Sequence, residues 1–311
     1  MASLTMAQAA LLTQDQLIQG VAKHILTVDL FANTLPFVAT NAKSLVINRE
    51  LTESGSAFVD INASTNSTGA TVTQDVYPLG RIVGDVEVDD FEQVAMSSIN
   101  DQMGLQTELK SKAVGRKWKD AIITGTGTFP QFSGISNLVD ASQIVEASST
   151  TSGGSLTLAL LDQLIDQVTA KDGEVDFLLM NATMRRKFRA LVRAQGFSNE
   201  EVELGFLDPI TGDRGTQKVH AYDGIPIFRN DFIGTETVNN GSGKHRIYAG
   251  VYGEGEGLVG LSPSDIDPGI RISVPFLSET KDATLRRVKM YTGLGLYSKR
   301  ALAKLSNLTA A

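Results

Sequence analysis

Alternating apolar and polar residues mark an extended segment in the first third of the chain. Between residues 57 and 64 every second side chain is apolar, a period of two that predicts a half-buried β-strand. Residues 66–69, Asn-Ser-Thr-Gly, predict a turn. Alternation resumes at Val72 and Val76 and continues through Ile82, Val86 and Val88. The pattern predicts a strand–turn–strand arm over residues 54–89.

This arm lacks an obvious cover for its apolar side. A strand of ten residues is about 33 Å long, and an isolated two-stranded hairpin is marginally stable in water. No segment close to it in the sequence is suited to cover it. We therefore expect another subunit to pack on its apolar edge, which is formed by Phe58, Val59, Ile61, Val72 and Val76.

Residues 90–124 carry the clearest helical pattern. Apolar side chains recur at three- and four-residue spacings, and lysines and arginines gather near the end, where cations suit the helix dipole. Gly125 and Gly127 end the helix. A long helix with so narrow an apolar stripe contacts the core on one side and solvent or a neighbour on the other.

The middle of the chain alternates helices with short strands. The pattern predicts a helix over residues 158–169, a buried strand over 175–180, and a second helix that Asn181 caps and Gly196 ends. Shorter strands are predicted around residues 218–222, 225–228, 246–252, 271–274 and 285–297. Strands outnumber helices, so the predicted fold class is α+β. The pattern of residues 1–44 predicts an extended or partly helical arm, and this arm either packs on its own domain or binds a partner.

Composition narrows the class of protein. The 311 residues, 42% hydrophobic and 20% charged, are enough for one or two intertwined globular domains. The net charge of -7 argues against dedicated polyanion binding but suits a surface that faces packed nucleic acid without adhering to it. The chain has no cysteine, so stability must come from packing and self-association. We expect no secretory signal and no membrane span.

Catalytic and ligand-binding motifs are weak throughout. Gly255–Gly260 matches G-x-G-x-x-G, but Pro263 and Pro268 forbid the helix that a dinucleotide site needs, so we interpret it as a strand-linking loop. His24, His220 and His245 lack metal-ligand spacing. No nucleophile elbow or phosphate-binding loop is present. The sequence therefore predicts no enzyme, cofactor or metal site.

One predicted helix is strongly basic. Arg185, Arg186, Lys187, Arg189 and Arg193 follow Asn181 within a single helix. We favour the interpretation that these charges face solvent or form salt bridges between subunits. Contact with nucleic acid is less favoured, because few aromatic residues lie between the charges.

The order of these pieces resembles the major capsid proteins of tailed bacteriophages, the HK97-like fold that encapsulins share. The arm before the long helix resembles the extended loop that precedes the spine helix of that family. Further matching segments are Asp120–Pro130 with Phe132–Ile135, Leu178–Thr183 with the helix that follows, Gly224–Ile227, and Arg286–Leu302. The resemblance covers about residues 45–305.

The resemblance implies an α+β, HK97-like capsid fold with defined parts. These are an N-terminal arm (1–44), an extended loop hairpin with flanking strands (45–89), a peripheral domain with the spine helix (90–135 and 256–297), and an axial domain (136–255 and 298–311). Leu161, Ile165, Phe177 and Leu179 are expected in the axial core. The extended loop is expected to reach over a neighbouring subunit.

The implied function is that of a major capsid protein that self-assembles into pentamers and hexamers of an icosahedral shell enclosing double-stranded DNA. The implied partners are other copies of the chain, a portal, a separate scaffold protein, a decoration protein where one is used, and packaged DNA bound non-specifically, with no membrane. The implied location is the virion, after synthesis in the cytoplasm of the host bacterium.

Two departures from relatives refine the implication. Some relatives join subunits through an isopeptide bond from a lysine in the extended loop, but no lysine lies between Lys43 and Lys110 here. The contacts are therefore expected to be non-covalent. Residues 1–44 are also too few for the fused scaffold domain that some relatives carry, which implies a separate scaffold or none.

Two alternatives stay open at this point. An encapsulin-like bacterial nanocompartment shell would share the fold and differ in its contents, enzyme cargo in place of DNA. A soluble enzyme or monomeric binding domain is the alternative of a different class, and it would behave as a stable monomer in size-exclusion chromatography.

Overall fold

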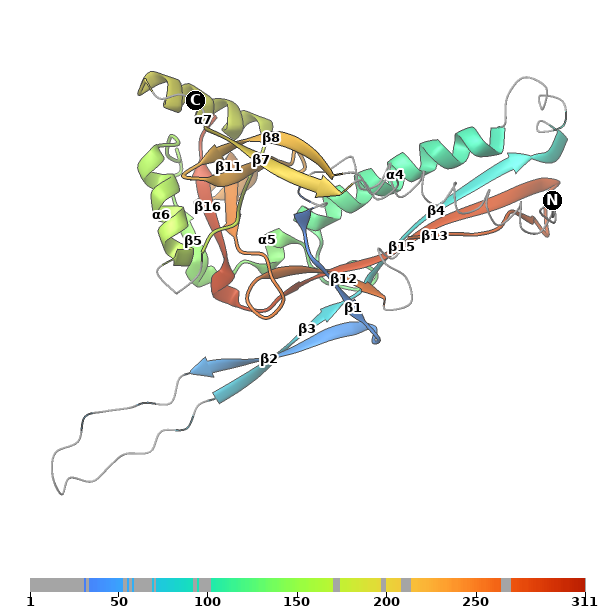
Figure 1. Cartoon of the computed structure of the whole chain (residues 1–311), viewed down its shortest axis with the longest axis horizontal. Coiled ribbons are helices and arrows are strands. Elements are labelled where there is room, and N and C mark those ends of the chain that lie inside the picture. Colours follow the sequence, from blue (N-terminus) through green and yellow to red (C-terminus); the bar gives the residue numbers. More distant parts are fainter. Residues whose placement is uncertain are drawn as a thin grey trace.

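The computed structural model describes residues 31, 34–52, 55, 58, 69, 71–91, 94, 102–169, 174–196, 200–207, 214–263 and 270–310. Within these residues the strands form a sheet of six, a sheet of eight and a ribbon of two. In Figure 1 the larger sheet and two helices form one end of the body, a long helix runs toward the other end, and the ribbon projects away from both. This mixture confirms the predicted α+β fold class.

The six-stranded sheet is organised around one long strand, β15 (Ala283–Leu296). Its described order is β1–β12–β15–β13, with β4 and β14 also paired to β15. These strands are β1 (Phe37–Thr40), β4 (Gly80–Asp89), β12 (Leu258–Pro263), β13 (Ile270–Ile272) and β14 (Phe276–Leu277). The pair β1–β12 is parallel, and β4 runs antiparallel to β15 along its full length.

The long helix α4 (Gln102–Thr124) packs against this sheet. Val114, Trp118 and Ile122 on one face are buried, whereas Leu105 and Leu109 stay exposed, as expected for a narrow apolar stripe. Gly84 of β4 allows the close approach, because a Cβ there would lie 2.7 Å from the Lys110 side chain. The predicted helix is thus confirmed over residues 102–124, while residues 95–101 lie outside the described residues.

Two glycines make the turn after α4 possible. Gly134 N–H donates to the carbonyl of Gly125 at 2.9 Å, and an added Cβ at Gly125 would lie 2.3 Å from the carbonyl oxygen of Phe132. The two backbones therefore touch where any side chain would separate them. Ile135, fully buried, then begins the short helix α5 (Ile135–Leu138).

The eight-stranded sheet has the described order β5–β16–β11–β6–β9–β8–β7, with β10 paired to β11. Its strands are β5 (Ile144–Glu146), β6 (Phe177–Met180), β7 (Glu200–Leu207), β8 (Arg214–Tyr222), β9 (Ile225–Arg229), β10 (Glu236–Val238), β11 (Gly241–Gly250) and β16 (Leu302–Leu308). Short 3-10 helices η1 (Ala141–Gln143) and η2 (Lys299–Ala301) precede β5 and β16. All four residues of β6 are buried, so both faces of the sheet are covered there.

Helices α6 (Leu158–Thr169) and α7 (Ala182–Ala194) pack on this sheet and confirm two predictions. α6 has the predicted limits, with Leu161, Leu164 and Val168 buried. α7 is capped as expected, because the Asn181 side chain accepts a hydrogen bond from the N–H of Met184 at 3.0 Å. Three residues predicted for the axial core, Leu161, Phe177 and Leu179, are fully buried in the hydrophobic core, and Ile165 packs against it.

The described part of the N-terminal segment packs on its own chain. Phe31 is fully buried, with its ring centroid 5.1 Å from that of Phe177 and 5.7 Å from that of Phe228. β1 then adds to the six-stranded sheet next to β12. Of the two interpretations of residues 1–44, packing on the chain's own domain therefore holds for residues 31 and 37–40, while residues 1–30 lie outside the described residues.

The predicted limits of the arm, residues 54–89, are wrong at both ends. β4 belongs to the six-stranded sheet, where Val86 and Val88 are only 3% and 6% exposed, and not to the projecting hairpin. The ribbon is instead β2 (Ser44–Thr52) paired with β3 (Thr71–Pro78). The alternation through residues 82–88 did indicate a half-buried strand, but its cover comes from α4 and from β15, about 200 residues away in the chain. Of the predicted strand at residues 57–64 and the predicted turn at 66–69, the structure describes only residues 58 and 69.

Candidate intersubunit surface on the projecting ribbon

The residues predicted to contact a neighbour are exposed wherever the structure describes them. Phe58, Val72 and Val76 are 110%, 70% and 55% exposed. Val59 and Ile61 lie outside the described residues. Figure 1 shows β2 and β3 extending away from both sheets. The exposure of these side chains is consistent with a surface that binds a partner. The contact with a neighbouring subunit stays a prediction.

The outer face of the ribbon is a narrow apolar surface. Val46 of β2 is directly opposite Val76 of β3, and both are about half exposed. Val72 lies on the same face, since residues two and four apart share a face of a strand. Between the valines, Gln74 donates a hydrogen bond to Asn48 at 3.1 Å. We call these five residues the outer ribbon face.

Val46 is the member of this face that sequence reasoning missed. The alternation predicted an arm that begins at residue 54, and the Leu45-Val46-Ile47 run entered only within the hairpin with flanking strands (45–89) that the resemblance implied, without being identified as a ribbon strand. The signal that could have revealed it is the alternation across that run, in which Val46 is exposed and Ile47 is 8% exposed. A second strand with the same alternation, Val76-Tyr77, supplies its partner.

The inner face of the ribbon root is packed on the body of the protein. Ile47 and Tyr77 are buried, and Leu45 reaches β15, where an added Cβ on Gly295 would be 3.2 Å from its side chain. The ribbon therefore has one apolar face that its own chain covers near the root and another that its own chain leaves exposed.

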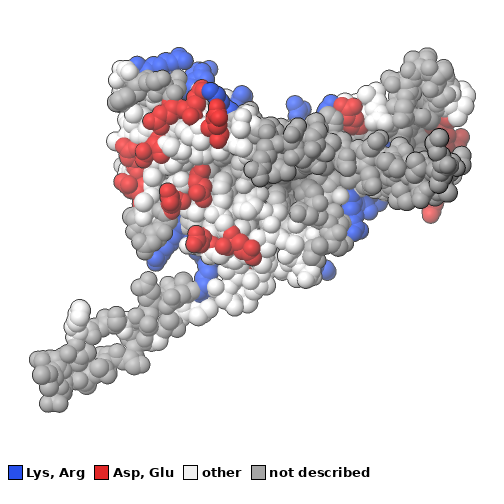
Figure 2. Space-filling model, viewed as in Figure 1, with Lys and Arg blue, Asp and Glu red and all other residues white. Residues whose placement is uncertain are grey.

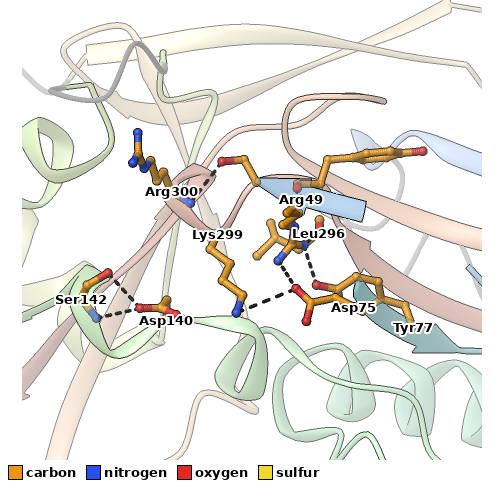
Figure 3. Close-up of polar contacts among 10 residues, drawn as sticks. Arg49, Asp75, Tyr77, Asp140, Ser142, Leu296, Lys299 and Arg300 are labelled. Carbon is orange, nitrogen blue, oxygen red and sulfur yellow. Dashed lines mark hydrogen bonds and ion pairs between the residues drawn. The ribbon is translucent and has the colours of Figure 1, made fainter. Parts of the chain in front are cut away.

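Arg49 fixes the root of the ribbon through four hydrogen bonds (Figure 3). Its Nε donates to the carbonyl of Tyr297 at 2.6 Å. One terminal nitrogen donates to the Asp75 carboxylate at 2.6 Å, and the other donates to the Tyr77 hydroxyl at 2.6 Å and to the carbonyl of Leu296. Arg49 thus ties both ribbon strands to the end of β15. We call this group the Arg49 clamp.

Burial and a nearby lysine strengthen the ion pair of the Arg49 clamp. The Arg49 side chain is only 10% exposed and that of Asp75 is 28% exposed, so the ion pair is largely shielded from water. Lys299 places its Nζ 3.8 Å from the same carboxylate. Burial raises the pKa of Tyr77, although the hydrogen bond from Arg49 acts in the opposite direction. The Tyr77 hydroxyl is therefore protonated at neutral pH.

A cavity of about 490 Å³ opens beside the clamp, between the ribbon root and residues 140–143 and 297–300. Its walls are polar and include Asn48, Thr73, Ser142 and Lys299. Among the described residues that line it, Asp140 is the one carboxylate, and it accepts hydrogen bonds from the N–H and the hydroxyl of Ser142 at 3.0 and 2.8 Å. That carboxylate therefore stabilises η1.

The other candidate motifs have structural roles. Residues 254–256 form a turn and β12 begins at Leu258, so a strand stands where a dinucleotide site requires a helix, which confirms the strand-linking loop. Nδ1 of His245 is 2.9 Å from the Asn181 amide nitrogen in the interior, and His220 lies 3.7 Å from Glu201. His24 lies outside the described residues. Among the residues described, no three His, Cys, Asp or Glu side chains are grouped as metal ligands would be.

A membrane-spanning helix was not expected. In the part of the chain that the structure describes, no helix has both the length and the apolar character needed to cross a bilayer.

The long helix packed on one sheet, the second sheet capped by two helices and the projecting ribbon together define the HK97-like capsid fold. Solved structures of this class are similar over nearly the whole chain. The holo-SrpI encapsulin complex from Synechococcus elongatus PCC 7942 matches with a TM-score of 0.69 and 21% identity, covering 90% of this chain and 88% of that chain. The capsid of a native GTA particle matches with a TM-score of 0.61 and 14% identity, covering 92% and 91%. Mycobacterium phage Ogopogo matches with a TM-score of 0.58 and 14% identity, covering 89% and 90%.

A family comparison adds information about function. The model of the SU10 major capsid protein family matches residues 83–235, just under half of the chain. This span includes most of β4, all of α4 and both helices on the eight-stranded sheet. No curated protein matches the chain. The family match and the capsid fold support the function of a capsid shell protein built from many copies of the chain, with a structural role in the virion. The encapsulin alternative has the support of the fold but not of the family match.

Proposed function

We propose that the chain is the major capsid protein of a tailed bacteriophage, whose copies form the pentamers and hexamers of an icosahedral shell around double-stranded DNA. In this proposal the six-stranded sheet with α4 is the peripheral domain and the eight-stranded sheet is the axial domain. The observation that carries the proposal is the outer ribbon face, because it exposes valines on a ribbon whose opposite face is anchored to the body.

The shell is held by non-covalent contacts in this proposal. The stretch from 44 to 109 contains no lysine, so the ribbon cannot form an isopeptide bond through a lysine of its own. Each ribbon contact can be weak, because closing the shell makes the later contacts effectively intramolecular. Copies assemble in the cytoplasm of the host bacterium, on a separate scaffold protein and with a portal at one vertex. A decoration protein fits the same scheme, and the packaged DNA is contacted without sequence specificity.

Replacing two valines of the outer ribbon face tests the proposal. Val72→Asp with Val76→Asp should abolish shells, because burying a valine contributes about 1.5–3 kcal/mol and an unpaired carboxylate in the contact costs more. Both side chains are exposed in the single chain, so the variant should fold normally. The matched control is Val72→Thr with Val76→Thr, which keeps the branched shape and should assemble to a much greater extent.

The readouts are particle yield by electron microscopy and folding by circular dichroism. Shells at unchanged yield from the aspartate variant would refute the assignment of the outer ribbon face as an interface.

An encapsulin-like compartment is the second candidate, and the similarity to the SrpI encapsulin complex favours it. The contents of particles purified from their native source separate the two candidates. Double-stranded DNA would support the capsid, and enzyme cargo without DNA would support the compartment. A soluble enzyme or binding domain would instead elute as a monomer in size-exclusion chromatography at all protein concentrations.

A further inference from the structure

One face of helix α7 presents a row of arginines. Arg185, Arg189 and Arg193 are spaced four residues apart and therefore lie on one side of the helix. The adjacent side of the helix, with Met184 and Phe188, is buried in the core. Figure 2 shows basic atoms along the edge of the molecule that α7 forms. We call these three residues the arginine stripe.

The stripe is not neutralised within the part of the chain that the structure describes. No described carboxylate lies within ion-pair distance of its three members, and the nearby Arg229 is itself paired with Asp231. The Nε atoms of Arg185 and Arg189 are buried without a hydrogen-bond partner. Burial, followed by Arg189 and Arg229, lowers the pKa of Arg185.

Like charges at this spacing destabilise a helix. A stripe of this kind is therefore costly to the single chain and is expected to be compensated by negative charge from outside it.

A pocket of opposite charge lies elsewhere on the same sheet. Glu174, Asp176 and Glu256 line a cavity of about 620 Å³, and Arg300 is the one cation among its described lining residues. Asp176 accepts a hydrogen bond from the N–H of Tyr252 at 2.7 Å. Burial, followed by Glu174 and Glu256, raises the pKa of Asp176. We call this group the acidic pocket, and its surplus of carboxylates likewise needs positive charge from outside.

The acidic pocket and the start of α7 lie at opposite ends of β6. Asp176 directly precedes β6 and Asn181, the cap of α7, directly follows it, so the strand holds the pocket and the start of α7 roughly 16 Å apart at about 3.3 Å per residue. Both ends are rigid, because β6 and the inner side of α7 are buried. Two different complementary surfaces on one subunit are what a head-to-tail contact in a closed ring requires.

We propose that the arginine stripe of one copy binds the acidic pocket of the next copy around a capsomer. This contact rests on the proposed shell function, and it adds the surfaces that join axial domains within one ring. DNA is the other polyanion that the stripe would attract. A second copy fits better, because the chain carries a net charge of -7, which repels a polyanion, and it provides a matching acidic surface.

Charge reversal on each side tests the contact in the full chain. Arg185→Glu with Arg189→Glu, and separately Glu174→Lys with Glu256→Lys, should each lower particle yield at least about tenfold, because repulsion is repeated at every contact of the ring. Combining all four changes should restore particles, because the ion pairs re-form with inverted sign. Arg186→Glu is the matched control on the same helix, about 100° away from the stripe, and should lower yield much less.

Folding is checked by circular dichroism and thermal denaturation. Because Arg185 and Arg189 are partly buried, the pocket variant, whose two glutamates are exposed, tests the contact independently of any folding defect.

The outcomes separate this contact from the proposed function. Restoration by the combined variant supports the contact. Normal yield from both charge-reversed variants, or no restoration by the combination, overturns the contact while leaving the shell function in place. A stripe variant that assembles normally but no longer retards DNA in a gel-shift assay would overturn it in favour of DNA binding. Absence of particles from the unmodified chain would overturn both.

Discussion

Removing the Arg49 side chain should loosen the ribbon without unfolding the protein. Arg49→Ala deletes the donors to Asp75, to Tyr77 and to the carbonyls of Leu296 and Tyr297. Hydrogen bonds to charged groups each contribute about 1.5–3 kcal/mol, and breaking a buried ion pair costs about 3–5 kcal/mol. Asp75 is partly exposed and retains Lys299 at 3.8 Å, which reduces the loss. We therefore expect a cost of about 3 kcal/mol in docking the ribbon, or roughly a hundredfold in its equilibrium constant.

Hydrogen exchange measures this change where it occurs. A hairpin released from the body is marginal in water, so amides of residues 44–49 and 73–77 should lose protection roughly a hundredfold. Amides of α6 and β6 should be unchanged. Asn48→Ala is the matched control, because Asn48 is the adjacent, exposed residue of β2 and bonds only to Gln74 among the described residues. Arg49→Lys should fall between the two, since it keeps the charge but loses the branched set of donors.

Two results would refute this reasoning. Unchanged protection of the ribbon amides in Arg49→Ala would show that Leu45, Ile47 and Tyr77 hold the root without the clamp. A loss of protection spread evenly over the molecule would show that Arg49 stabilises the whole fold and not the ribbon.

Three further predictions concern stability and are measured by denaturation. Gly125→Ala should lower the free energy of unfolding by about 1–3 kcal/mol, because the added Cβ would lie 2.3 Å from the backbone of Phe132. Gly234→Ala is the control, because the space around Gly234 is open, and equal losses in the two variants would contradict this reasoning. Leu161→Ala should cost about 2–5 kcal/mol as a fully buried core residue, and a loss below about 1 kcal/mol would count against that core assignment. Burial, followed by Lys187, lowers the pKa of His245 in the folded state, so the unfolded chain takes up its proton first and stability should fall as pH drops below about 6.5. His245→Gln should flatten that dependence between pH 7.5 and 5.5, and an unchanged slope would contradict it.

Local signals in the sequence were sufficient for both helices of the eight-stranded sheet and for β6, β8, β9 and β11, whereas β5, β7, β10 and β16 were not predicted. α6 was predicted with its observed limits because its apolar residues follow a helical period. The start of α7 was predicted because Asn181 is an efficient N-cap. β6 was predicted because an unbroken apolar run bounded by polar residues indicates a strand covered on both faces.

The ribbon could not be placed from sequence, for two physical reasons. Alternation at residues 82–88 shows that one face of a strand is buried, but it does not identify the partner, and β15 is about 200 residues away. The partners of Arg49 are the Asp75 carboxylate, the Tyr77 hydroxyl and two backbone carbonyls, and no sequence pattern reveals these contacts. The first strand of the ribbon was therefore missed, together with Val46.

Cryo-electron microscopy of the purified full-length chain tests the central claim most directly. We expect closed shells in which Val72 and Val76 of each ribbon are covered by an adjacent copy. A population of single molecules with an ordered ribbon exposed to solvent on both faces of its outer half would contradict the account.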